Sequence, residues 1–149
     1  MKKIIFGLIG MSVVLLADFS RDNTKEVVLD SQTCLMWQDN KGAKNGYHEW
    51  EDALDYCNNL DLGGYTNWRL PNMNEAITIL NFPAESLDNT YYDYINQTFK
   101  NVRSEYWTST KSYWGNSSGT RWIINYGTGI MYGNLDEKSN MNVRCVRNK

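Results

Sequence analysis

Histidine is almost absent from this chain of 149 residues, because His48 is its only one. A zinc site or a catalytic base built on His48 needs further ligands or a nucleophile close by. Its neighbours Tyr47 and Glu49 supply neither. We therefore expect His48 to be a solvated residue at the start of a helix.

The sequence also has none of the spacings that mark a metal site or an activated nucleophile. No row of alternating acids ends in Glu, as it does in a calcium-binding loop. We expect no catalytic residue, no metal and no cofactor, and hence no enzyme. One alternative stays open, because the 17 Asp and Glu residues allow many pairs of the kind that glycosidases use.

No apolar run reaches the roughly 20 residues that a membrane-spanning helix needs. The apolar run at residues 4–16 follows two lysines and ends at Ala17, before a charged stretch. This order predicts a secretory signal peptide over residues 1–17. Leu15 stands where a small residue usually precedes the cleavage site, so an uncleaved N-terminal anchor is the alternative. We expect an exported protein, in the periplasm, at the cell surface or secreted, with no stable membrane span after cleavage.

Positive charge is less frequent than negative charge in the chain that remains after cleavage. Cleavage removes Lys2 and Lys3, so that 13 Lys and Arg face 17 Asp and Glu over residues 18–149, a net charge of −4. Proteins that bind nucleic acid are normally basic, so we expect no nucleic-acid partner. The 132 remaining residues suit one domain, which buries roughly two thirds of the surface of the unfolded chain.

Cysteine is present in an odd number, as Cys34, Cys57 and Cys145. Disulfides persist outside the cytoplasm. Three cysteines allow at most one bridge within the chain, so one thiol is left over.

Two helices are predicted between groups of strands. The first covers residues 50–60 and ends before Gly63 and Gly64, because its apolar residues recur at helical spacing. Its buried stripe is Trp50, Ala53, Leu54, Cys57 and Leu60. The second follows Pro71, with Asn72 as the N-cap and Glu75 three residues later. Its buried face is expected to be Ala76, Ile77 and Leu80.

Short strands are expected on both sides of these helices. They are residues 26–29, 35–38, 106–109, 120–126, 129–132 and 142–147. The first two make a hairpin, while residues 39–47 read as a polar loop. In residues 120–126, Trp122, Ile124 and Tyr126 alternate with Ile123 and Asn125, which predicts a strand with one buried face. Strands, then helices, then strands indicate an α+β fold.

Six segments together resemble one known family. They are TCLMWQ at 33–38, the Trp50-Ala53-Cys57-Leu60 helix pattern, GGYTNWRLPNMNE at 63–75, YWTST at 106–110, RWIINYG at 121–127 and VRCVR at 143–147. This order is similar to the C-terminal domain family of the Legionella collagen-like protein, Lcl. The resemblance covers residues 27–147. The family that it points to is related to the C-type-lectin fold.

The resemblance implies a C-type-lectin-like α+β domain, with two helices packed on a curved antiparallel sheet and long loops. It also implies a disulfide between Cys57 and Cys145, as well as adhesion through host glycans, especially sulfated ones. Two features differ from the family. Cys34 stands where the family usually has Gly, and the acidic charge argues against a sulfated ligand.

The ligand site is expected in the polar loop at residues 111–119. Its exposed aromatic pair, Tyr113 and Trp114, can stack on a sugar or on an apolar patch of a partner. The expected polar neighbours are Arg121, Asn125, Tyr132 and Asn134. The other tryptophans of the family pattern are expected in the core: Trp37, Trp50, Trp68, Trp107 and Trp122.

These observations favour an exported, non-catalytic binding module whose partner is a glycan or a surface protein. The alternative is a structural or assembly protein of the cell envelope that binds a protein partner or itself, as a homo-oligomer. We expect Cys34 to be a buried free thiol that packs as a small hydrophobic residue. Exposure of Cys34, with a link between two chains, would favour the alternative.

Overall fold

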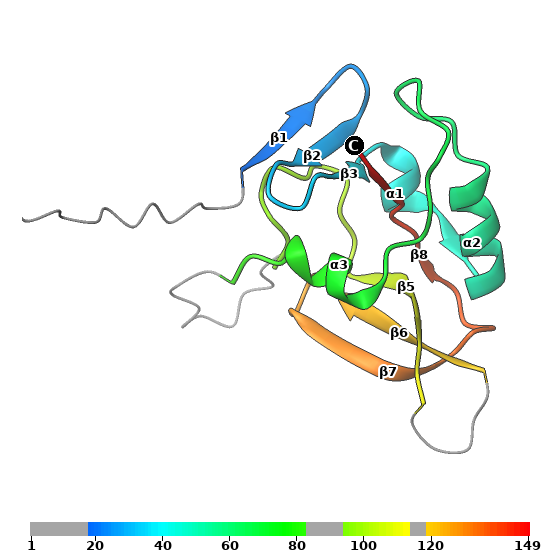
Figure 1. Cartoon of the computed structure of the whole chain (residues 1–149). Coiled ribbons are helices and arrows are strands. Elements are labelled where there is room, and N and C mark those ends of the chain that lie inside the picture. The colour runs from blue at the N-terminus through cyan, green and yellow to red at the C-terminus, as the bar shows by residue number, and fades with distance from the viewer. Residues whose placement is uncertain (1–17, 83–93, 114–118) are drawn as a thin grey trace, which may run out of the picture.

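The computed structural model describes residues 18–82, 94–113 and 119–149, apart from the side chains of Asn134 and Leu135. In these residues the protein has two β-sheets and three short helices (Figure 1). The prediction of an α+β fold is confirmed. The prediction of two helices on one sheet is wrong, since the strands divide into two sheets and the polar loop contains a further helix.

The first sheet has the strand order β1-β2-β3-β9. Its strands are β1 (Phe19–Asp22), β2 (Val27–Asp30), β3 (Leu35–Gln38) and β9 (Val146–Asn148). The predicted hairpin is confirmed, because β2 and β3 pair antiparallel with Leu29 opposite Met36. The sequence analysis missed β1, whose partly buried residues alternate with exposed ones.

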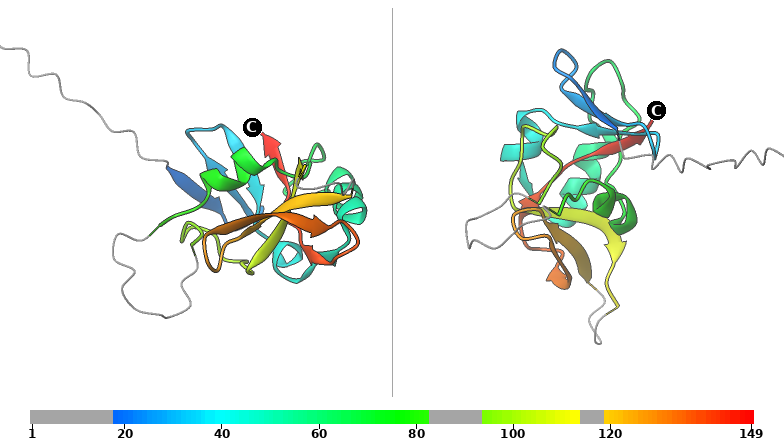
Figure 2. Two further views of the ribbon diagram at one scale, coloured as in Figure 1. Left: turned by 90° about the horizontal axis from the view of Figure 1, so that it is seen from below. Right: turned by 90° about the vertical axis from the view of Figure 1, so that its left-hand side faces the viewer.

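The second sheet has the strand order β4-β8-β5-β6-β7. Its strands are β4 (Tyr47–His48), β8 (Met141–Asn142), β5 (Glu105–Lys111), β6 (Thr120–Asn125) and β7 (Ile130–Asp136). One pair, β5 with β8, is parallel, and it joins Tyr106 to Asn142. The β1–β2 hairpin and the β6–β7 pair lie at opposite ends of the domain (Figures 1 and 2).

The strand predicted at residues 142–147 divides into β8 and β9, one in each sheet. Between them, Val143, Arg144 and Cys145 are all buried. The backbone here leaves the second sheet and bonds to the first, where the amide of Gln38 donates to the Cys145 carbonyl at 2.9 Å. The connection thus crosses the interior, which the apolar pattern alone cannot distinguish from one continuous strand.

The strands separate two hydrophobic cores, because neighbouring residues point to opposite faces. Val27 faces the first core and Val28 the second; Ile123 and Ile124 divide in the same way. The prediction that residues 120–126 have one buried face is therefore wrong, since both faces are covered. Of the predicted core tryptophans, Trp37, Trp50, Trp68 and Trp107 are buried, and Trp122 is half-buried.

The three helices begin and end where local side chains dictate. α1 (Lys41–Asn45) is capped by Asn40, and α3 (Met73–Thr78) has the predicted capping box of Asn72 and Glu75. α3 buries Ala76 as predicted, but it leaves Ile77 exposed at 38% and is followed by the fully buried Ile79.

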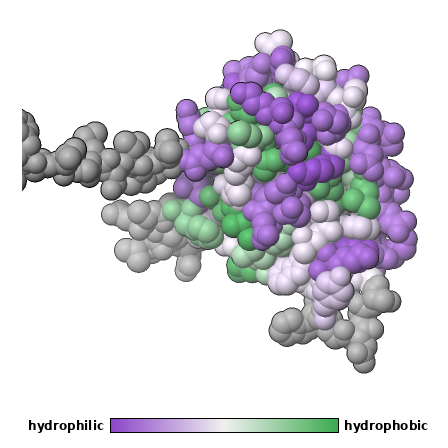
Figure 3. Space-filling model, viewed as in Figure 1, coloured by the Kyte–Doolittle hydropathy of each residue, from purple (hydrophilic) through white to green (hydrophobic). Residues whose placement is uncertain are grey.

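The long helix α2 (Trp50–Asn58) buries Trp50, Ala53 and Cys57, as its stripe predicts. It ends at Asn59, before the predicted glycines, which instead lie in the turn closed by Leu62 and Tyr65. Its outer face carries exposed acids, and hydrophilic residues gather over this side of the domain (Figure 3).

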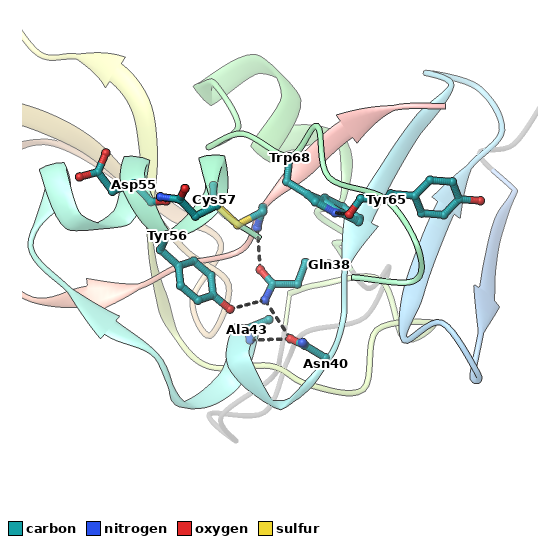
Figure 4. The surroundings of a disulfide bond; sticks show 10 residues. Gln38, Asn40, Ala43, Asp55, Tyr56, Cys57, Tyr65 and Trp68 are labelled. Carbon is teal, nitrogen blue, oxygen red and sulfur yellow. Dashed lines mark hydrogen bonds between the residues drawn. A yellow bond between two sulfur atoms is a disulfide. The ribbon is translucent and has the colours of Figure 1, made fainter. Parts of the chain in front are cut away.

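A disulfide joins Cys57 of α2 to Cys145, 88 residues later in the chain (Figure 4). This confirms the pairing implied by the family resemblance. Gln38 lies beside the disulfide and forms hydrogen bonds at one end of it and next to the other. Its side-chain oxygen accepts from the Cys145 amide at 3.0 Å, and its Nε2 donates to the Tyr56 hydroxyl at 2.7 Å. The bridge therefore ties α2 to the first sheet.

The prediction that Cys34 is buried is wrong, because its free thiol is exposed. Cys34 ends the turn between β2 and β3 with φ of 57°. That left-handed conformation favours glycine, the usual family residue at this position. The turn points its side chain away from both cores.

Candidate functional site

The residues predicted for the ligand site differ in exposure, and only some of them are described. Tyr113, just beyond β5, is 87% exposed. Trp114 and the side chain of Asn134 lie outside the described residues. Arg121 is buried; its guanidinium lies 3.9 Å from the centre of the Trp50 ring and pairs with Glu137 at 2.9 Å. These contacts give Arg121 a role in packing, while a ligand contact by Tyr113 stays a prediction.

Asn125 and Tyr132 do come together, across β6 and β7. The Asn125 side-chain amide donates to the Tyr132 hydroxyl at 3.1 Å. Its oxygen accepts from the amides of Gly127 and Thr128 at 2.9 and 3.1 Å, which fixes the turn after β6. Asn125 is buried, whereas 37% of Tyr132 is exposed.

Asn125 also faces a cavity of about 310 Å³ at one end of the second sheet. We call this cavity the polar hollow. It is lined by Tyr47, Arg103, Ser104, Glu105, Asn125 and Asn142. Strand pairing explains the convergence, because Tyr47 lies opposite Asn142 and Glu105 lies opposite Asn125. Four strands and the segment before β5 thus supply one polar surface.

Two side chains of the polar hollow hold its walls in place. The Asn142 amide donates to the carbonyls of Lys44 and Gly46 at 3.0 and 3.3 Å, which orders the connection from α1 to β4. The Asn125 amide reaches Glu105 at 3.4 Å. These buried amides make the polar hollow a preformed feature of the sheet rather than a surface of mobile loops.

Three other side chains of the polar hollow remain open to a ligand. Tyr47 is 59% exposed, which leaves its ring available for stacking. Arg103 is exposed, and it makes no ion pair with any described residue. Glu105 is half-buried and uses one oxygen on Asn125. An aromatic ring, a donor and an acceptor therefore border one cavity.

Sequence analysis missed Tyr47, Arg103, Glu105 and Asn142. Tyr47 and Asn142 belong to two-residue strands, which are too short to give a periodic signal. Arg103 and Glu105 lie just before a predicted strand. Their polar character at the end of that strand was the one sequence signal that could have pointed to a site. Only the pairing of distant strands brings them together.

In the part of the chain that the structure describes, no group of three or more His, Cys, Asp or Glu side chains gathers closely enough to hold a metal ion. His48 ends β4 and directly precedes Glu49, the N-cap residue of α2, so its predicted place just before this helix is confirmed. Its ring is half-buried rather than solvated and packs on Tyr56 with 5.0 Å between ring centres.

Comparison with protein families matches residues 26–147 to the Lcl C-terminal domain. The chain belongs to this family. A comparison with curated proteins finds no match. The Lcl C-terminal domain is a domain of Legionella collagen-like surface proteins, and the matched residues include every strand and helix described above except β1 and the end of β9.

Two further observations bear on where this Lcl C-terminal domain works. Its Cys57–Cys145 disulfide indicates an oxidising compartment outside the cytoplasm. Among residues 18–82, 94–113 and 119–149, no helix has the length and apolar character needed to cross a membrane. The predicted signal peptide, residues 1–17, lies outside the described residues.

Proposed function

We propose that this Lcl C-terminal domain is an exported, non-catalytic module that binds a glycan in the polar hollow. The observation that carries the proposal is the exposed ring of Tyr47 beside Arg103 and Glu105 over one cavity. Sugars are bound in this way, by a ring under the apolar face of the sugar and by side chains that exchange hydrogen bonds with its hydroxyls. No metal is needed for such contacts.

Three finer features belong to the same proposal. The fold is of the C-type-lectin-like kind, with its ligand held by a rigid sheet. The protein reaches the periplasm, the cell surface or the medium through the signal peptide at residues 1–17, and its partner is a glycan or a glycosylated surface protein. Nucleic acid is not a partner, because the exported part carries a net charge of −4.

A glycan array tests this proposal with the purified protein and two matched tyrosine variants. We expect specific binding that Tyr47→Ala abolishes and Tyr113→Ala leaves unchanged. Both tyrosines are exposed, so neither substitution should alter the fold, which circular dichroism and thermal unfolding would check. Glu105→Gln should also weaken binding, because an amide donates where the carboxylate only accepts.

The opposite pattern would place the site elsewhere. Binding lost in Tyr113→Ala and retained in Tyr47→Ala would favour the loop at residues 111–119 that the sequence predicts. Binding to no glycan at all would contradict the proposal and favour a role in envelope assembly.

One observation supports that second candidate function. The Cys34 thiol is exposed, so it is accessible to another chain. Non-reducing electrophoresis of protein prepared from the envelope tests it. A disulfide-linked dimer that disappears in Cys34→Ser would support an assembly role, and a monomer in both samples would argue against a Cys34 link.

A further inference from the structure

A second cavity, of about 470 Å³, lies on the first sheet, away from the polar hollow. We call it the Tyr65 groove. It runs between the β1–β2 hairpin and Tyr65, which lies in the loop after α2. The hairpin and this loop stand on the same side of the domain in Figure 1 and in the right-hand view of Figure 2.

The floor of the Tyr65 groove is apolar. Val27 and Leu29 lie two residues apart on β2 and therefore share one face, and Met36 pairs with Leu29 from β3. Val27 and Met36 also belong to the first core. Leu29 is only half-buried, so the apolar interior opens to the surface at this point.

Two cations contact the ring of Tyr65. Lys25 is part of the lining of the groove, whereas Arg147 lies beside it, with its Nη1 3.8 Å from the sulfur of Met36. The Lys25 ammonium lies 5.1 Å from the ring centre and donates to the Tyr65 hydroxyl at 3.1 Å. The Arg147 guanidinium lies 4.2 Å from the same centre. Arg147 is held there by Asn67, whose side-chain oxygen accepts from its Nε at 2.7 Å. Contact with an aromatic face stabilises each cation and fixes its position.

Asp22 is an acidic side chain of the groove, and its charge acts on Lys25 without forming an ion pair with it. Neither Lys25 nor Arg147 forms an ion pair with any described Asp or Glu. Asp22 lines the groove, but one of its oxygens accepts the backbone amides of Thr24 and Lys25 at 2.9 and 3.0 Å. Arg21, also in the lining, is paired with Asp39 at 2.6 Å.

We propose that the Tyr65 groove binds a small amphiphilic anion, an alkyl chain that ends in a carboxylate. The carboxylate lies between Lys25 and Arg147, where charge-assisted hydrogen bonds replace the missing acid partner. The alkyl chain lies over Leu29 and Met36, which removes apolar surface from water. A neutral sugar has no charge to pair with the two cations, and a hydrophilic polyanion has no apolar surface to cover the floor of the groove.

Fluorescence titration with dansyl-undecanoate tests the proposal on the purified protein. We expect emission to rise and shift to shorter wavelength on binding. Lys25→Gln and Arg147→Gln should each weaken binding about tenfold, the usual effect of losing one charge-assisted hydrogen bond. Arg147→Lys should restore part of the affinity. Leu29→Asn should weaken binding without removing a charge.

The matched control is Lys138→Gln, which removes an exposed lysine that follows β7, does not line the groove and pairs with Glu49 at the start of α2. It should leave the affinity unchanged, as should the polar-hollow variant Tyr47→Ala, so that this site and the proposed glycan site fail or succeed separately. Thermal unfolding of each variant would confirm that it is folded.

Five results would overturn the proposal. Four of them are absence of binding by the probe, equal binding of its methyl ester, equal loss of affinity in Lys138→Gln, and binding of dextran sulfate in its place. The last result would mean that the cations serve an extended polyanion. Binding to phosphatidylglycerol vesicles without binding of the free probe would equally overturn it, because the groove would then not hold a single amphiphile.

Discussion

The guanidinium of Arg69 holds both carboxylate oxygens of Glu75, with Nη1 at 2.7 Å from Oε2 and Nη2 at 2.6 Å from Oε1. Glu75 also accepts the backbone amide of Asn72 at 2.9 Å, so the same carboxylate closes the capping box of α3. The backbone of Arg69 in turn exchanges hydrogen bonds with Val146 of β9. The segment WRLPNMNE at residues 68–75 therefore links α3 to the first sheet.

This pair predicts a specific dependence of stability on pH. Burial alone would raise the pKa of Glu75, but the hydrogen bonds from Arg69 and Asn72 and the charge of Arg69 outweigh it and lower the pKa below its ordinary 4.5. A carboxyl group with a lowered pKa in the folded state stabilises the fold above its unfolded value. That stabilisation is lost as the pH falls through the lowered pKa.

We therefore expect Glu75→Gln to be less stable than the natural protein at neutral pH. The difference should shrink as the pH falls below 4.5. Urea unfolding over a pH series measures it, with the exposed Glu51→Gln as control. A stability difference that stays constant down the series would contradict the prediction.

Asp39 predicts a large loss of stability on removal of one charge. Its side chain is fully buried, and it accepts from Arg21 at 2.6 Å and from Arg144 at 3.2 Å. The amides of Lys100 and Asn101 donate to it as well, each at 3.0 Å. Asp39→Ala leaves the buried Arg144 without a counter-ion, which should lower the free energy of unfolding by about 3–5 kcal/mol. Chemical denaturation checks this against the exposed Asp61→Ala, which should change it by less than about 0.5 kcal/mol.

The disulfide predicts sensitivity to reduction. The double variant Cys57→Ala/Cys145→Ala should lose about 2–5 kcal/mol of stability, as is typical when a native bridge leaves a small exported domain. Reducing agent should lower the melting temperature of the natural protein and leave that of the double variant unchanged. Equal effects of the reductant on both proteins would mean that the bond contributes nothing to stability.

Cys34 predicts a stabilising substitution. Its φ of 57° costs a residue with a side chain roughly 1–2 kcal/mol, while glycine adopts it freely. Glycine also has more freedom in the unfolded chain, which offsets part of this gain. Cys34→Gly should therefore raise the free energy of unfolding by about 0.5–1 kcal/mol. Cys34→Ala keeps the left-handed backbone strain and should give no such gain. Equal stability of the two variants would show that backbone conformation is not the cause.

The local elements were predictable because their signals are local. The stripe of α2 follows from helical spacing, and the capping box of α3 follows from Asn72 and Glu75 three residues apart. The β2–β3 hairpin needs only a turn between two strands. The candidate site was not predictable in the same way. Asn125 and Tyr132 were named from sequence, but two other residues of the polar hollow, Tyr47 and Asn142, come from strands of two residues.

The sequence by itself determined the family, the α+β class and the pairing implied for Cys57 and Cys145, because each depends on residue types at fixed spacing. Tertiary structure alone decided the rest. It buried Arg121 against Trp50, exposed Cys34, and split the last predicted strand between two sheets. These outcomes depend on which strands pair and which faces meet. Strand pairing depends on how both cores pack at the same time, so it cannot be predicted from any single segment.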